Sequence, residues 1–203
     1  MDKGFQKIVL KLDATLRTAG PHIFYEPPVD HILSGFYIDK GRSLLYFGFT
    51  FLPLCGNKLT FLPLGYGDRL PGDSWGVEIG GSDQDIACRF LESIAPYRDM
   101  ARDLKNLNNG IAYLERNSLI GSVHARKSLA CLLIVAEKFA EAEYHLETML
   151  DSNMKAEAPM PNWLKDVISD AKNLIRSLKD DAIETRSNIL EQEMENKIKF
   201  DIL

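Results

Sequence analysis

Between residues 31 and 66, three hydrophobic segments separated by two short turn signals predict three consecutive antiparallel strands. Lys40-Gly41 and Gly56-Asn57 interrupt this pattern and suit two-residue hairpin turns. Each turn, taken separately, brings phenylalanine and leucine to the same side of the sheet. The predicted apolar face comprises Ile32, Ser34, Phe36, Ile38, Ser43, Leu45, Phe47, Phe49, Phe51, Leu62 and Leu64.

The pairing of the first two strands follows from the turn at Lys40-Gly41. It sets Phe36 opposite Leu45. It also sets Gly35 opposite Tyr46, an arrangement in which an aromatic ring covers a glycine. A shift of one residue would exchange the two faces of the sheet, so we expect the register to be strongly held.

The segments that flank these strands extend the predicted fold. Apolar residues at helical spacing between residues 5 and 16 predict an N-terminal helix that covers the apolar face and ends before Gly20-Pro21. Residues 22–30 include two further prolines and predict an extended connector with a short edge strand. Residues 74–79 alternate again and predict a fourth strand, in which Trp75 faces the core.

From Ser82 onward the hydrophobic period changes to that of a helix. Ser82 and Asp85 suit a capping box, and Pro96 ends the first helix. A second helix is predicted from Tyr97 to a stop at residues 108–110, with one or two further turns after it. The pattern therefore predicts an α+β fold: an N-terminal helix, a small antiparallel sheet of about four strands, and an all-helical C-terminal half.

Two segments after residue 152 carry helical stripes of different width. The first, from Trp163 to Leu178, is clearly amphipathic, and the second, from Ala182 to Ile198, is narrower and rich in charge. We expect residues 1–152 to form the α+β domain and residues 153–203 a C-terminal helical extension. The pattern leaves open whether residues 179–203 fold back on the domain or pair with another chain.

Residues 122–152 predict a helical hairpin that turns near Glu137-Lys138. Its large and small residues are spaced as in one tetratricopeptide repeat, which the hairpin resembles. The aromatic expected at Arg126 and the proline expected near Met154 are absent, and no second copy follows. The residues that carry the spacing are Leu129, Ala130, Leu133, Phe139, Ala142 and Leu146.

Over about residues 1–150, the order of elements resembles small bacterial α+β proteins of a domain family of unknown function. The residues that carry this resemblance are Phe36, Phe47, Phe49, Trp75 and the hairpin of residues 129–146. The resemblance implies an order of elements and no particular activity.

The charge of the chain indicates which classes of macromolecule it could bind. The chain carries 24 basic and 29 acidic side chains, a net charge of −5. Residues 1–80 hold eight of each sign, so the whole acidic excess lies in the helical part. Nucleic-acid binding requires a clustered basic surface, so we expect no nucleic-acid partner. A basic protein would be attracted to this chain.

The cysteines and the apolar runs indicate the compartment. Cys55, Cys88 and Cys131 are odd in number, widely spaced and set in apolar sequence, which predicts buried thiols in a reducing environment. The N-terminal residues do not form a secretory signal. The apolar run at residues 129–136 is too short to cross a membrane. We therefore expect a cytoplasmic protein that has no membrane partner.

One loop carries chemically varied side chains and is the candidate ligand site. Asp68, Asp73 and Arg69 could meet a ligand in a loop whose aspartates lie beside glycines, a pattern also typical of turns. The histidines and cysteines are not spaced as metal ligands, so we predict no metal, no cofactor and no catalytic residue. The candidate ligand-binding residues are Tyr37, Tyr46, Tyr66, Asp68, Arg69 and Asp73.

These observations favour a non-catalytic cytoplasmic protein-binding module, for example an inhibitor or immunity-type protein directed at a basic toxin. Two alternatives stay open. The first is a small-ligand binder or hydrolase that uses residues 66–73 with Tyr37 or Tyr46. The second is a homo-oligomeric scaffold held together by residues 163–198. The sequence leaves open whether the chain is an enzyme.

Overall fold

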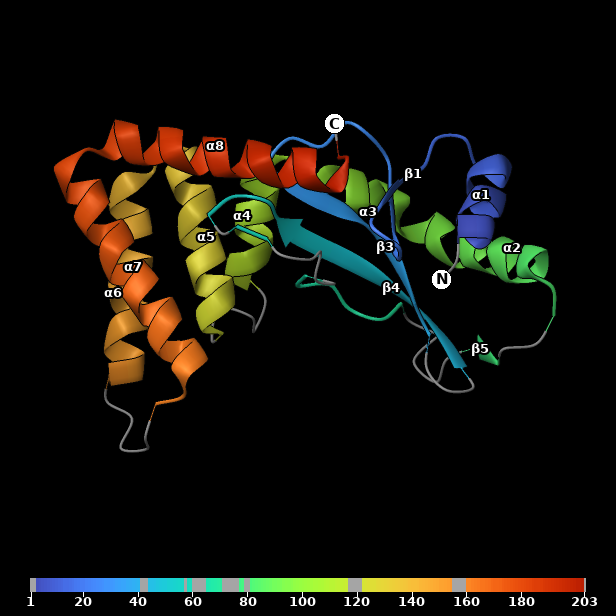
Figure 1. Cartoon of the computed structure of the whole chain (residues 1–203), viewed down its shortest axis with the longest axis horizontal. Coiled ribbons are helices and arrows are strands. Elements are labelled where there is room, and N and C mark those ends of the chain that lie inside the picture. The colour runs from blue at the N-terminus through green and yellow to red at the C-terminus, as the bar shows by residue number, and fades with distance from the viewer. Residues whose placement is uncertain are drawn as a thin grey trace. The chain divides into compact units, whose positions relative to one another are not determined.

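The computed structural model describes residues 3–40, 44–56, 58–59, 65–70, 77–78, 81–116, 122–154 and 160–202 (Figure 1). The chain divides into two compact units. Unit 1 comprises residues 1–54, 59–106 and 196–203, and unit 2 comprises residues 55–58 and 107–195. The predicted boundary at residue 152 falls within unit 2.

Strands concentrate near the N-terminus and helices follow them, so the predicted α+β class is confirmed. The strands are β1 (Arg17–Ala19), β2 (Ile23–Tyr25), β3 (Ile32–Lys40), β4 (Leu44–Pro53) and β5 (Val77–Glu78). The helices are α1 (Lys3–Leu12), α2 (Asp83–Ile94), the 3-10 helix η1 (Ala95–Tyr97), α3 (Arg98–Asp103), α4 (Leu107–Arg116), α5 (Val123–Val135), α6 (Phe139–Met154), α7 (Asn162–Asp180) and α8 (Ala182–Phe200).

The strands of unit 1 form one antiparallel sheet in the order β1-β2-β3-β4-β5. The strand predicted within residues 22–30 is β2. The prediction that it lies at the edge of the sheet was wrong, because β2 pairs with β1 on one side and with β3 on the other. β1 has three residues, fewer than an alternating pattern needs to be recognised, so the sequence did not predict it.

β3 and β4 pair as predicted, but in a different register. Phe36 lies opposite Phe49 and not Leu45, while Lys40 lies opposite Leu45. Because Lys40 lies opposite Leu45, the prediction of a two-residue turn at Lys40-Gly41 was wrong. The pairing has moved by an even number of residues, so the predicted face of each strand is retained.

The observed register changes which glycine lies under an aromatic ring. Gly35 lies opposite Thr50, and Gly48 lies opposite Tyr37. A Cβ atom on Gly48 would overlap the Tyr37 ring, so the ring rests directly on the glycine backbone. The predicted kind of contact is present, but the predicted pairing of Gly35 with Tyr46 was wrong.

Helices that follow Ser82 cover the apolar face of the sheet, as predicted for them. The Phe90 ring of α2 contacts the rings of Phe24 and Phe47, with centroids 5.1 and 5.4 Å apart. α1 packs against α2 (Figure 1). The buried apolar residues of this face include Ile32, Phe36, Ile38, Leu45, Phe47, Phe49 and Phe51.

The opposite face of the sheet carries a second apolar cluster, to which the end of the chain contributes. Ile202 is buried in this cluster, and Phe200 packs against it. The Asn196 amide donates to the Leu54 carbonyl at 2.8 Å and accepts from the Leu59 N–H at 2.9 Å. Residues 196–202 therefore fold back on unit 1. The other members of the cluster are Ala19, Ile23, Tyr25, Leu33, Tyr37, Leu52 and Leu54, with Val29 and Leu59 at its margin.

Helix α2 begins at Ser82 and ends before Pro96, as predicted, whereas the predicted end of the next helix is wrong. The Ser82 hydroxyl accepts from the Asp85 N–H, and the Asp85 carboxylate accepts from the Ser82 N–H, which is the predicted capping box. The predicted stop at residues 108–110 was wrong, because these residues lie in the first turn of α4. Gly110 is buried there, so it serves close packing and not a helix end.

The predicted strands at residues 58–66 and 74–79 lie mainly outside the described residues. Gly65 forms an isolated bridge with Phe51, and β5 pairs with the first residues of β4. Asp73 and Trp75 lie outside the described residues, so their predicted roles remain predictions.

Unit 2 contains the predicted helical hairpin. α5 and α6 pack along each other, and α7 packs against both (Figure 1). The turn passes through Glu137, whose φ of 61° reverses the chain between the helices. The buried residues of the hairpin include Leu129, Ala130, Leu133, Ala142 and Leu146. The resemblance to a tetratricopeptide repeat stays a prediction.

Candidate functional site

The loop that sequence analysis singled out runs beside β4 in unit 1. The Tyr66 N–H donates to the Phe51 carbonyl at 2.8 Å, and the Phe49 N–H donates to the Asp68 carbonyl at 2.7 Å. The Leu70 N–H donates to another β4 carbonyl at 3.1 Å. These backbone bonds attach residues 65–70 to the strand.

Five of the six predicted site residues lie in or beside this loop, and the sixth, Asp73, lies outside the described residues. The Arg69 guanidinium lies 3.9 Å from the centre of the Tyr46 ring, within range of a cation–π interaction. The Asp68 carboxylate accepts from the Arg69 N–H at 2.8 Å. Burial raises the pKa of Tyr37, while the positive charge of Arg69 acts against this rise. Tyr66 joins the loop through its backbone.

The interactions of Asp68 and Arg69 in this cluster stabilise the conformation of the loop. Asp68 bonds the backbone of its own neighbour, as turn aspartates do. Arg69 covers an aromatic ring. The structure therefore brings Tyr37, Tyr46, Asp68 and Arg69 together, and it gives the two charged side chains local roles.

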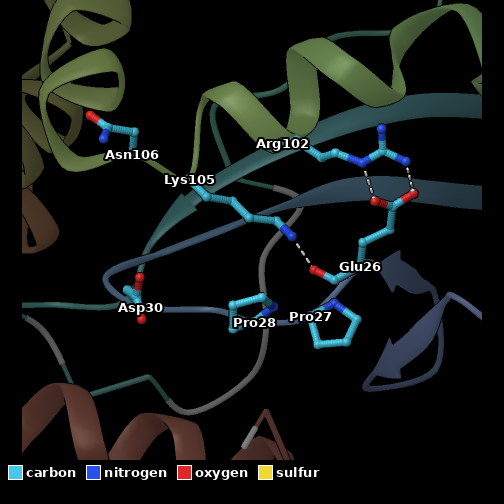
Figure 2. A pocket seen from close by; sticks show the side chains of 7 residues that line it. All are labelled: Glu26, Pro27, Pro28, Asp30, Arg102, Lys105 and Asn106. Atoms are coloured by element: carbon cyan, nitrogen blue, oxygen red, sulfur yellow. Dashed lines mark hydrogen bonds and ion pairs between the residues drawn. The ribbon is translucent and has the colours of Figure 1, made fainter.

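A second arrangement in unit 1 is a charged cleft that sequence analysis did not predict. It has a volume of about 380 Å³ (Figure 2). The connector after β2 supplies one wall, and α3 with the turn after it supplies the other. The lining residues are Glu26, Pro27, Pro28, Asp30, Arg102, Lys105 and Asn106.

Glu26 is the central anion of this cleft. Its carboxylate accepts from Arg102 Nε at 2.5 Å and from Arg98 Nε at 2.5 Å. Only 14% of its side chain is exposed. Burial raises the pKa of this carboxyl, but the hydrogen bonds from Arg102 and Arg98 outweigh burial and leave the pKa below its usual range.

Arg98 extends the network away from the cleft. It donates to the Asp13 carboxylate at 2.7 Å and to the Thr15 hydroxyl at 2.6 Å. Burial raises the pKa of Asp13, but hydrogen bonds from Thr15 and Arg98 lower it by more. The network thus connects the segment after α1, the segment after β2 and α3.

Lys105 reaches the same cleft from the turn after α3. Its ammonium group donates to the backbone carbonyl of Glu26 (Figure 2). Burial lowers the pKa of Lys105, and the Glu26 charge partly restores it. The helical spacing of Arg98, Arg102 and Lys105 is visible in the sequence. Their acceptor, 72 to 79 residues earlier, is not, because no local pattern indicates so distant a partner.

In unit 2, the surface of α6 combines acidic side chains with an exposed tyrosine. Tyr144 is 65% exposed, and α6 contains no lysine or arginine. The buried residues Ala142 and Leu146 lie on the opposite side of the helix. We name this surface the α6 face; it comprises the exposed residues Glu141, Tyr144, Glu147 and Asp151 and the half-buried Thr148.

Lysines partly neutralise this surface. Lys179 of α7 lies 2.6 Å from Glu143 and 3.4 Å from Glu147. Lys138 lies 3.6 Å from Glu141. The whole of unit 2 carries 15 acidic and 11 basic side chains, so its net charge is −4. The acidic excess predicted for the helical half is concentrated in unit 2.

The cysteines divide into two kinds. Burial raises the pKa of the Cys131 thiol to about 11 and that of the Cys55 thiol above its ordinary value. Such thiols are poor nucleophiles. Cys88 is exposed, so the prediction that it is buried was wrong. It lies on the outer side of α2, away from Phe90 and Ile94, which face the core.

Within the described residues, no group of three or more histidine, cysteine or acidic side chains could hold a metal ion. His124 instead stacks on Trp163, with ring centroids 5.4 Å apart. Among the helices of the described part of the chain, none is long and apolar enough to cross a membrane.

Compared with known proteins, the chain matches no family model, no curated protein sequence and no solved structure. Its function is therefore inferred from the arrangement of its side chains.

Proposed function

We propose that the protein is a non-catalytic protein-binding module and that the α6 face receives its partner. The observation that carries the proposal is the exposure of Tyr144, 65%, in the middle of a helix whose charged side chains are all acidic. Tyrosine is among the residues that contribute most to protein interfaces, because its large ring keeps a polar end.

Charge supports a basic partner. Unit 2 carries a net charge of −4, and its excess is greatest where α6 has no cation of its own. Lys138 and Lys179 neutralise part of the α6 face but leave it negative. Complementary charge speeds the encounter of two proteins and discriminates against acidic competitors.

The same proposal includes a cytoplasmic location. Cys55, Cys88 and Cys131 are all free thiols, as is common in a reducing compartment. An inhibitor or immunity-type protein, which would neutralise a basic toxin by covering its surface, is one form that such a module could take.

Site-specific photo-crosslinking tests the proposal. A photoreactive residue would replace Tyr144 in the full chain, and the matched control would carry it in place of the exposed Trp163 of α7. We expect position 144 to capture a discrete basic protein that position 163 does not capture. Capture of a second copy of the chain by position 163 would support the scaffold alternative, which was predicted to use residues 163–198.

Binding measurements with the purified partner then test the role of the face. We expect Tyr144→Ala to weaken binding about tenfold or more, and Trp163→Ala to leave it within about twofold. Asp151→Lys should slow association and reduce its dependence on salt. Equal effects of the two aromatic substitutions, or an association rate that is independent of salt, would contradict the proposal.

A further inference from the structure

The cleft of unit 1 presents opposite charges to the same small volume. Arg102 and Lys105 lie on one wall and Asp30 on the other (Figure 2). The volume of about 380 Å³ falls within the range of small-molecule sites. We propose that this cleft binds a small zwitterion of the amino-acid type, whose carboxylate meets Lys105 and Arg102 and whose ammonium group meets Asp30.

Lys105 has donors to spare at the cationic end. A protonated lysine has three N–H donors, and the bond to the Glu26 carbonyl uses one of them. Among the described residues, no carboxylate lies within ion-pair distance of Lys105. The charges of Glu26 and Asp30 act on its ammonium group from farther away, and the Glu26 carboxylate is bonded to Arg98 and Arg102. A partly buried cation with unused donors favours an incoming carboxylate.

Asp30 offers the complementary end. Its side chain is exposed, and within the described residues its charge acts on Lys105 without a hydrogen bond or an ion pair to it. A carboxylate of this kind can accept from an ammonium group without first breaking another contact.

The balance of charge selects the class of ligand. A simple anion of the phosphate type would meet Asp30, and a simple cation would meet Arg102 and Lys105. A zwitterion places each of its charges beside the opposite charge of the cleft. The rings of Pro27 and Pro28 line the same cleft and offer apolar surface to a ligand side chain.

Three probes that share an isobutyl group test this inference on the full chain. L-leucine carries both charges, isocaproate lacks the ammonium group, and isoamylamine lacks the carboxylate. Each would be titrated to tens of millimolar while backbone amide resonances are followed by NMR. We expect L-leucine to shift the resonances of residues 26–30 and 102–106, and to bind about tenfold more tightly than either analogue.

Substitutions then assign the two ends. Lys105→Met and Asp30→Asn should each weaken the binding of L-leucine about tenfold, and Lys7→Met, on the exposed side of α1, should not weaken it. Asp30→Asn should also strengthen the binding of isocaproate, because the repelling charge is gone. Asp30 is exposed, so this variant retains the fold even if Lys105→Met does not, and a thermal melt checks both.

Three outcomes would overturn the inference. The first is equal affinity of the wild-type chain for L-leucine and isocaproate, which would indicate a general anion site. The second is the absence of any shift at the cleft. The third is an unchanged affinity for L-leucine in Asp30→Asn. None of these results bears on the α6 face, which belongs to unit 2.

Discussion

Glu26 shows how a single residue acquires its character from distant sequence. Its partners Arg98 and Arg102 lie 72 and 76 residues later in the chain. In the sequence, Glu26 is a carboxylate before two prolines, which indicates only that it lies outside a helix interior. The arginines fall at helical spacing, but this spacing does not indicate which acidic residue they bind. The cleft therefore could not be predicted locally.

Replacing Glu26 by Gln should destabilise unit 1. The change removes the negative charge that both arginines approach, and we expect a cost of about 1–3 kcal/mol at neutral pH. Urea unfolding measures the cost. Asp99→Asn is the matched control, because Asp99 also pairs with Arg102 but its side chain is 90% exposed. That variant should lose less than about 1 kcal/mol.

The same carboxyl predicts a dependence on pH. The folded-state pKa of Glu26 is lowered, so its contribution to stability is complete above the unfolded value of about 4.3. The contribution is lost as pH falls through the lower, folded-state value. The difference in unfolding free energy between wild type and Glu26→Gln should therefore shrink on acidification below this range. A difference that grows as pH falls would contradict the assignment.

At the scale of elements, α2 and the sheet depend on each other. α2 begins at a capping box that four residues of sequence specify, Ser82 to Asp85. Its Phe90 then fills the space between Phe24 of β2 and Phe47 of β4. The helix stripe and the strand alternation were each visible in the sequence, and matching two apolar faces is enough to predict that they meet.

Truncation of this contact should be costly. We expect Phe90→Ala to reduce the unfolding free energy by about 3–5 kcal/mol, because the core cannot fill the space of a lost ring. Glu92→Ala, on the exposed side of the same helix, should change it by about 0.5 kcal/mol or less. Denaturant titration compares the two variants. Similar losses in both would show that helix propensity, and not ring packing, limits stability.

At the scale of the molecule, unit 1 is completed by residues from the far end of the chain. Residues 196–203 belong to it, although residues 107–195 form most of unit 2. Asn196 attaches these residues to the rest of unit 1. Its amide donates to the buried Leu54 carbonyl and accepts from the Leu59 N–H, both in the segment after β4. The sequence pattern could not decide this course, since a narrow stripe with many charges is compatible with several partners.

Asn196→Ala tests this attachment. It leaves the Leu54 carbonyl and the Leu59 N–H without their partner, and we expect a loss of about 2–4 kcal/mol in the unfolding free energy of unit 1. Hydrogen exchange of the Leu59 amide should accelerate in parallel. Asn188→Ala, at an exposed position on the same helix, is the control and should leave both quantities near their wild-type values. Unchanged exchange at Leu59 would contradict this role of Asn196.

The sequence by itself determined the class of fold, the two faces of the strands, the capping box of α2, the helical hairpin and the region of acidic excess. The acidic excess follows from a count of charged residues, and the other features follow from periods and spacings within a few turns or strand pairs. Only the tertiary structure decided the register of β3 with β4, the internal position of β2, the partners of Glu26 and the return of residues 196–202. Those features depend on loop length and on contacts between residues far apart in the chain, which leave no periodic trace in the sequence.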